Sequence, residues 1–139
     1  MRTWMVVEDE PDLYEMVLAM YATLSIEGIS FVTGEEALEW IDEVDSGQFE
    51  SEIPELALLD IRLPGRVNGV EVAARLRQSD TLGHIVIVFM TAYRLSPSEE
   101  RKVMQQSGAD LLLYKPLPPL EEFHDMMEDL IIRHRRGLS

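Results

Sequence analysis

The sequence predicts an α/β protein in which a doubly wound, five-stranded parallel sheet carries five helices. Short apolar runs of strand length recur five times along the 139 residues. Most of these runs lack alternating polar residues, which is typical of parallel strands that are covered on both faces. Segments with the period of an amphipathic helix lie between the runs. Strict alternation of strands and helices, joined by right-handed crossovers, places helices on both faces of one sheet.

Each expected strand is a short apolar run. In chain order these runs are Trp4–Val7, Ile29–Val32, Leu56–Leu59, Ile85–Met90 and Leu111–Tyr114. Between the second and third runs, the stretch from Asp45 to Pro54 is acidic and rich in turn-forming residues. We expect this stretch to be a surface loop before the third strand.

The expected helices are marked by apolar stripes and by residues that suit helix ends. The first and last helices have stripes at helical spacing, formed by Leu13, Met16, Val17 and Met20 and by Leu120, Phe123, Met127 and Leu130. The second, third and fourth helices start at sequences with capping-box spacing or a close variant, namely Thr33–Glu36, Asn68–Glu71 and Ser96–Glu99. Residues that suit a first helical turn are Pro11, Pro97 and Pro118-Pro119, and Gly108 suits a helix end.

Composition limits the classes of function. With 26 acidic and 12 basic residues, the formal charge is −14, which repels phosphate backbones, so we expect no direct contact with nucleic acid. The basic cluster from Arg133 to Arg136 is expected at a solvated helix end. The chain has no cysteine, no apolar run near the ~20 residues that span a bilayer and no signal-like start. We therefore expect one cytoplasmic domain over residues 1–139, without membrane contact and without an output domain.

Polar residues follow four of the five apolar runs at the point where each run ends. Glu8 and Asp9 follow the first run, Asp60 the third, Thr91 the fourth and Lys115 the fifth. Ligands of open parallel sheets bind beyond the carboxyl ends of the strands. The sequence thus predicts three carboxylates, a hydroxyl and an ammonium group at one edge of the sheet.

Three carboxylates in one place imply a bound cation, because two carboxylates about 4 Å apart repel by roughly 4 kcal/mol at an effective dielectric constant near 20. Oxygen ligands without histidine or cysteine favour Mg²⁺, which keeps water molecules and leaves positions open for phosphate oxygens. In this interpretation Asp60 is a nucleophile that accepts a phosphoryl group. The metal, Lys115 and Thr91 neutralise charge on the phosphoryl oxygens.

Each of these residues also has an ordinary structural explanation. Asp60 alone could be a turn or capping aspartate, and Lys115 a structural ion-pair partner. Glu8 and Asp9 could form a solvated acidic turn at the start of a helix. The combination favours the functional interpretation, because a buried strand delivers the Asp60 charge at its end while complementary groups end three other strands.

These motifs resemble the receiver domain of two-component response regulators over nearly the whole chain. The matching segments are Val6–Pro11, Leu58–Gly65, Asn68-Gly69, Met90–Ala92 and Tyr114–Pro116. The resemblance implies a flavodoxin-like, receiver-type fold. It also implies a signalling switch that promotes its own aspartyl phosphorylation and dephosphorylation, rather than an enzyme. The phosphoryl donor is a phosphohistidine on a sensor histidine kinase or a histidine phosphotransfer protein.

The same resemblance assigns the metal ligands. Glu8 and Asp9 are the acid pair that binds Mg²⁺, with Asp9 the more direct ligand. Asp60 and the backbone carbonyl of Arg62 supply further oxygen atoms.

The resemblance also assigns the groups that act on the phosphoryl group. Asp60 is the phosphoacceptor, Thr91 the switch hydroxyl and Lys115 the phosphate-contacting lysine. The side chains of Arg62 and Tyr93 flank the site and tune the lifetime of the phosphoryl group. The change is read at the face of the fourth helix, fifth strand and fifth helix, where a downstream protein target or a second copy of the chain binds.

The sequence departs from the family pattern at two places. Between Asp60 and Asn68-Gly69 the loop carries Arg66-Val67 where one residue is typical. Leu112 stands three places before Lys115, where the family often has an aromatic residue that moves with the threonine. Tyr114 is expected to point to the opposite side of its strand from Lys115.

Three other classes of function compete with this interpretation. A phosphatase of the haloacid-dehalogenase type needs a second aspartate two places after the nucleophile, where this chain has Arg62. A flavin- or nucleotide-binding module needs a phosphate-binding loop after the first strand, where Glu8–Glu10 is electrostatically unsuitable. A receiver-like interaction module that is never phosphorylated stays open as the alternative.

Overall fold

The computed structural model describes residues 2–47 and 52–137. Five parallel strands form one sheet in the order β2-β1-β3-β4-β5. The strands are β1 (Thr3–Val7), β2 (Glu27–Phe31), β3 (Leu56–Asp60), β4 (Val86–Thr91) and β5 (Leu111–Tyr114). The helices are α1 (Pro11–Thr23), α2 (Gly34–Asp45), α3 (Gly69–Gln78), α4 (Pro97–Ser107) and α5 (Leu120–Arg135). The predicted fold class is confirmed.

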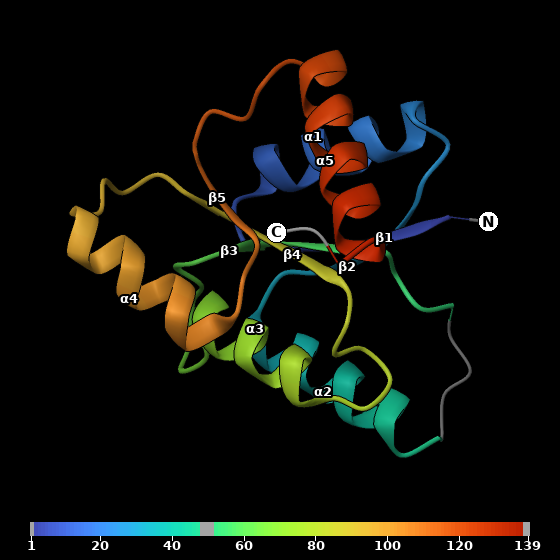
Figure 1. Cartoon of the computed structure of the whole chain (residues 1–139), viewed down its shortest axis with the longest axis vertical. Helices are drawn as coiled ribbons and strands as arrows, with labels where there is room; N and C mark the ends of the chain where they lie inside the picture. The colour runs from blue at the N-terminus through green and yellow to red at the C-terminus, as the bar shows by residue number, and fades with distance from the viewer. Residues whose placement is uncertain (1, 48–51, 138–139) are drawn as a thin grey trace.

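The helices cover the sheet on both faces, with α1 and α5 on one face and α2, α3 and α4 on the other (Figure 1). Side chains of β1 alternate between the two layers. Trp4 and Val6 pack with α1 and α5, whereas Met5 and Val7 pack with α2 and α3. Both faces of the sheet are therefore apolar at its centre, which is why the sequences of the central strands lack polar alternation.

The helix ends match the capping signals in the sequence. Asn68 and Ser96 each form a complete capping box with the glutamate three residues later. Thr33 accepts a hydrogen bond from the Glu36 backbone N–H at 3.1 Å. Gly108 ends α4 in the left-handed conformation with φ +70°, which only glycine adopts without strain. Pro118-Pro119, expected in the first turn of α5, lie before it, since Pro119 is the N-cap residue and the helix begins at Leu120.

Several element boundaries differ from the expected ones. The edge strand β2 begins at Glu27, because its backbone pairs with β1 from Thr3 onward whatever the polarity of its side chains. Asp60 is the last residue of β3 and Thr91 the last residue of β4, whereas both were expected just after their strands. Met16, expected on the buried stripe of α1, is 42% exposed.

The predicted loop from Asp45 to Pro54 is described only in part. Asp45 is the last residue of α2 and pairs with Arg75 at 2.7 Å, so the helix runs to the residue at which the loop was expected to begin. Residues 48–51 of the predicted loop lie outside the described residues. In the part of the chain that the structure describes, no helix has the length and apolar character needed to cross a bilayer.

Candidate functional site

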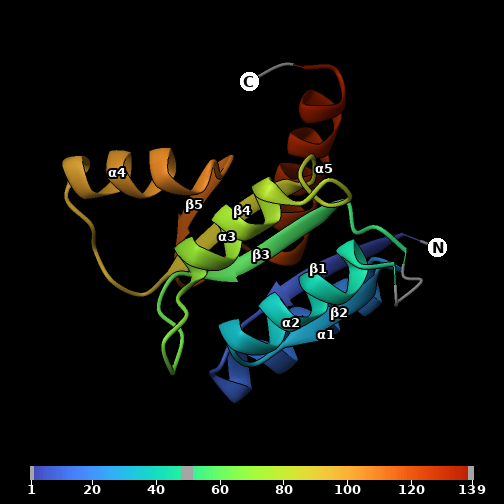
Figure 2. The same ribbon diagram turned by 90° about the horizontal axis from the view of Figure 1, so that it is seen from below.

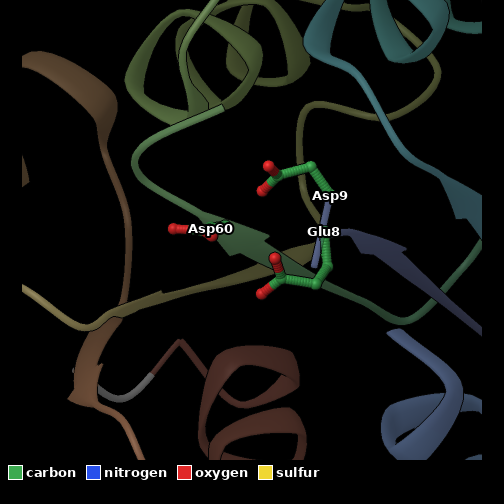
Figure 3. Close-up of side chains that lie close together, drawn as sticks. All are labelled: Glu8, Asp9 and Asp60. Carbon is green, nitrogen blue, oxygen red and sulfur yellow. The ribbon is translucent and has the colours of Figure 1, made fainter. Parts of the chain in front are cut away.

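The carboxylates of Glu8, Asp9 and Asp60 gather where β1 and β3 end. The two strands are neighbours, with Val7 paired to Leu59, so the residues that follow this pair, Glu8 and Asp60, lie side by side. Asp9 comes next in the chain, two residues after the end of β1. One carboxylate oxygen from each of the three residues lies within 4.8 Å of the others. In Figure 3 the Asp9 side chain lies above the end of β3 and the Glu8 side chain lies below it, with Asp60 at the strand end.

Lys115 places a cation against two of these carboxylates. Its Nζ lies 2.9 Å from Glu8 Oε1 and 3.0 Å from Asp60 Oδ2. Burial alone would lower the pKa of Lys115, but contacts with Glu8 and Asp60 outweigh burial and hold the pKa above its ordinary value. Lys115 is therefore a permanent positive charge at neutral pH.

Backbone N–H groups donate hydrogen bonds to the two buried carboxylates. The Arg62 N–H donates to Asp60 Oδ1 at 3.1 Å, and the Glu10 N–H donates to Glu8 Oε2 at 2.9 Å. Glu8 is fully buried. Its Oε1 forms an ion pair with Lys115 but accepts no hydrogen bond of good geometry from the described residues. A buried carboxylate oxygen without such a hydrogen bond is an available ligand for a cation or for its water.

Asp60 is hard to ionise in this environment. Burial raises its pKa, the Lys115 ammonium opposes this effect, and the Glu8 carboxylate adds to it, so the pKa rises from 3.8 to about 6. The site thus contains three acidic groups and one ammonium group, with less positive charge than the acids need. An additional cation would restore the balance.

Asp60 is only 5% exposed, yet it borders an open cleft of about 450 Å³. The described residues that line the cleft are Glu8, Asp9, Glu10, Pro11, Asp60, Arg62, Ala92, Tyr93 and Lys115. The predicted switch hydroxyl of Thr91 is not among them. Thr91 is buried, and its Oγ1 accepts a hydrogen bond from the Tyr93 N–H at 3.2 Å.

Two residues predicted to flank the site stack on one another. The Arg62 guanidinium carbon lies 3.8 Å from the centre of the Tyr93 ring, a cation–π geometry that holds two separate loops together. The longer loop after β3 is fixed by α2, because the Arg66 N–H donates to Glu35 Oε2 at 3.1 Å. Tyr93 itself is 52% exposed.

The residues fit a hard divalent cation. Every side-chain donor is a carboxylate oxygen, as Mg²⁺ prefers, and Asp9 is exposed at the rim of the cleft. Two of the three acids already face Lys115. Only Asp9 is free of that ammonium group, which suits it to a direct ligand role. Glu8, Asp9 and Asp60 could therefore hold the metal predicted from the sequence.

Sequence reasoning did not identify two parts of this region. The Glu10 N–H contact to Glu8 depends on the turn after β1, whose backbone conformation has no side-chain signature. Tyr114 donates a hydrogen bond from its hydroxyl to Glu100 on α4 and accepts one from the Leu95 N–H at 3.3 Å. Alternation along β5 predicts that Tyr114 and Lys115 point to opposite sides, but the contacts of Tyr114 depend on where α4 packs.

Comparisons with known proteins agree with this geometry. The family model of the response regulator receiver domain matches residues 4–128. The polar-differentiation response regulator DivK of Brucella anthropi is 32% identical over 113 residues, which cover 81% of this chain and 83% of that protein.

Two solved structures share the fold. The receiver domain of the sensor histidine kinase PA1611 from Pseudomonas aeruginosa PAO1, which has a magnesium ion coordinated in its active site cleft, is 22% identical with a TM-score of 0.75. The alignment covers 94% of this chain and 97% of that one. A CheY-like receiver domain protein from Methanospirillum hungatei JF-1 is 19% identical with a TM-score of 0.79, over 99% of this chain and 98% of that one.

Proposed function

Because the chain belongs to the response regulator receiver family, we propose that it is a phosphoryl-accepting switch of a two-component phosphorelay in which Asp60 is the phosphoacceptor. The observation that carries this proposal is the position of the Asp60 carboxylate. It borders the cleft, lies 3.0 Å from Lys115 Nζ, and shares its oxygen cluster with Glu8 and Asp9.

In the proposed reaction an Asp60 oxygen attacks the phosphorus atom of a phosphohistidine. The new O–P bond forms as the P–N bond to the donor's imidazole breaks, so the phosphoryl group passes from nitrogen to oxygen. Lys115 then moves from pairing with the free carboxylate to pairing with a phosphoryl oxygen. Thr91 supplies a hydroxyl to another phosphoryl oxygen once its side chain reaches the cleft.

The proposed metal is Mg²⁺, which Glu8, Asp9, Asp60 and the backbone carbonyl of Arg62 would hold, with Asp9 the more direct ligand of the acid pair. When bound, it supplies positive charge that favours the ionised form of Asp60 and balances the phosphoryl oxygens. Glu8 is buried against Lys115 and against the Glu10 N–H, so it would also hold these groups in register beside the metal.

The proposed phosphoryl donor is a sensor histidine kinase or a histidine phosphotransfer protein in the cytoplasm. Phosphorylation adds about −1.5 to −2 charge to an acidic cleft, and the end of β4 that carries Thr91 and the loop that carries Lys115 respond. We propose that a downstream protein target, or a second copy of the chain, reads this response at the face of α4, β5 and α5. Exposed residues of α4 that such a partner would meet include Glu99, Arg101 and Lys102.

The proposal is tested by exposing the protein to acetyl phosphate and, separately, to beryllofluoride, each with Mg²⁺. After acetyl phosphate, intact-mass measurement should show the addition of one phosphoryl group, whereas beryllofluoride should change the amide NMR spectrum. Asp60→Asn should abolish both responses. Asp80→Asn is the matched control, because Asp80 is exposed and lies beyond the end of α3, away from the cleft.

A folded wild-type protein that binds Mg²⁺ but accepts neither reagent would overturn the proposal and leave the receiver-like interaction module in its place. Transfer from a panel of phosphorylated histidine kinases then identifies the donor.

A further inference from the structure

The loop of residues 92–96 joins β4 to α4 and is fixed at both of its ends. At its start, the Tyr93 N–H donates to Thr91 Oγ1 at 3.2 Å. At its end, the Leu95 N–H donates to the Tyr114 hydroxyl at 3.3 Å. The loop therefore connects the buried Thr91 hydroxyl to an aromatic side chain on the neighbouring strand.

Tyr114 contacts both sides of this connection. Its hydroxyl donates to the Glu100 carboxylate on α4, and the Arg94 guanidinium carbon lies 4.6 Å from the centre of its ring. Because Glu100 accepts this hydrogen bond, the pKa of the Tyr114 hydroxyl lies above its ordinary value, so the group stays protonated and keeps donating at neutral pH. Figure 2 shows α4 next to β5 at the edge of the sheet.

Thr91 has to move if its hydroxyl is to contact a group on Asp60. It is 1% exposed, and among the described residues it is not part of the cleft lining, whereas its neighbours Ala92 and Tyr93 are. A shift of Thr91 towards the cleft carries the Tyr93 N–H with it, or breaks that hydrogen bond. In either case residues 92–96 must follow, and their far end is held by Tyr114.

We infer that Tyr114 is a positioning residue: its hydroxyl clasps the loop of residues 92–96 to α4, and thereby holds the Thr91 hydroxyl out of the cleft until Asp60 is phosphorylated. This inference rests on the proposed function, since it assigns a regulator of the same site. The clasp consists of Tyr114, Glu100, Leu95 and Arg94. Opening it releases Arg94 and the Tyr114 hydroxyl at the surface beside α4, so one contact links the cleft to that surface.

The clasp stabilises the unphosphorylated arrangement, so removing it should favour the phosphoryl-bound one. A ligand binds more tightly when the competing state of the protein is destabilised. Tyr114→Phe removes the hydroxyl and keeps the ring. This variant loses one to two hydrogen bonds of ordinary strength. We therefore expect it to bind beryllofluoride about three- to tenfold more tightly than the wild type does, with Mg²⁺ present. The affinity for Mg²⁺ alone should not change.

The test measures beryllofluoride affinity by fluorine NMR for the wild type and six variants, which include Thr91→Ala with and without Tyr114→Phe. Tyr14→Phe is the matched control, because it removes a hydroxyl that contacts Ser30 Oγ at 2.7 Å, on α1 and β2. Glu100→Ala should tighten binding as Tyr114→Phe does, whereas Glu100→Gln keeps an acceptor and should stay close to wild type. Tyr114→Phe in a Thr91→Ala background should have no effect, because the clasp acts through Thr91.

The outcomes separate the inference from the function on which it rests. If wild type binds beryllofluoride and Tyr114→Phe binds it with wild-type affinity, the clasp is refuted and the proposed function stands. If Tyr114→Phe tightens binding equally with and without Thr91, the assigned route is wrong. If the wild type binds no beryllofluoride at all, the proposed function itself fails, and the clasp with it.

Discussion

Burial and the Glu8 carboxylate make Asp60 unfavourable to ionise in the metal-free protein. Its pKa rises from 3.8 to about 6, so the folded state holds the proton more tightly than the unfolded chain does. The contribution of this group to stability is fully present below about pH 4 and is lost as the pH rises through about 6. At neutral pH the ionised Asp60 therefore destabilises the fold.

Asp60→Asn should thus raise the free energy of unfolding of the metal-free protein at neutral pH, by about 1–3 kcal/mol. Asparagine keeps the shape and can still accept from the Arg62 N–H. Urea unfolding with a chelator present measures the effect, which should shrink towards zero near pH 4. Asp80→Asn, an exposed aspartate, corrects for the general benefit of removing one negative charge from a chain of charge −14. If both variants gain the same stability, the surroundings of Asp60 do not disfavour its ionised form.

Lys115 is the one cation within ion-pair distance of Glu8 and Asp60 among the described residues. Lys115→Met keeps the bulk of the side chain but leaves two buried carboxylates without their positive partner, which should destabilise the metal-free protein by about 3–5 kcal/mol. Added Mg²⁺ should recover part of this loss, because it supplies charge at the same place.

Lys102→Met is the control for the Lys115 variant, since Lys102 is exposed on α4. Thermal unfolding of both variants, with Mg²⁺ and with a chelator, gives the comparison. Equal destabilisation of the two variants would show that Lys115 contributes bulk charge rather than a specific pairing.

At the scale of elements, the junction between β3 and α3 limits where Asp60 can lie. Gly69, the first residue of α3, donates its N–H to the Ile61 carbonyl at 2.9 Å. A Cβ at this position would lie 2.1 Å from the Asp60 backbone oxygen. Because backbone cannot turn away as a side chain can, the helix start or the strand end must shift.

Gly69→Ala should therefore destabilise the protein by about 1–3 kcal/mol and also weaken Mg²⁺ binding, because the shift moves Asp60. Gly28→Ala on β2 is the control, since its Cβ would meet Leu18 Cδ2 at 2.7 Å, the end of a flexible side chain. Unfolding and Mg²⁺ titration of the two variants test the expectation. A Gly69→Ala protein with wild-type metal affinity would show that the junction does not position the site.

The elements themselves were predictable because their signals are local. Uninterrupted apolar runs indicated the buried strands, and capping residues such as Asn68 and Ser96 indicated helix starts. The meeting of Glu8 and Asp60 was also predictable, since parallel strands end at a common edge. The clasp at Tyr114 was not, because it depends on the packing of α4 against β5, and the inward position of Thr91 depends on side-chain rotation at the end of a strand. Neither leaves a periodic signal in the sequence.

The whole molecule carries a formal charge of −14, so any added salt reduces its internal repulsion and raises its stability somewhat. Specific binding of Mg²⁺ adds a separate contribution that grows with the logarithm of metal concentration above the dissociation constant, reaching about 2.7 kcal/mol at a hundredfold excess over that constant. The two contributions differ in which residues they need. General screening depends on total charge, whereas specific binding depends on the carboxylates at the ends of β1 and β3.

Asp9→Ala should therefore remove most of the Mg²⁺-dependent stabilisation while leaving the metal-free stability nearly unchanged, because Asp9 is exposed and makes no ion pair with the described residues. Asp80→Ala removes one negative charge, as Asp9→Ala does, and should keep the full response to Mg²⁺. Thermal unfolding across a Mg²⁺ series, with ionic strength held constant by NaCl, separates the two. Should Asp9→Ala respond to Mg²⁺ as strongly as Asp80→Ala does, the stabilisation comes from screening of the whole acidic surface, and the carboxylate cluster is not the site that the metal occupies.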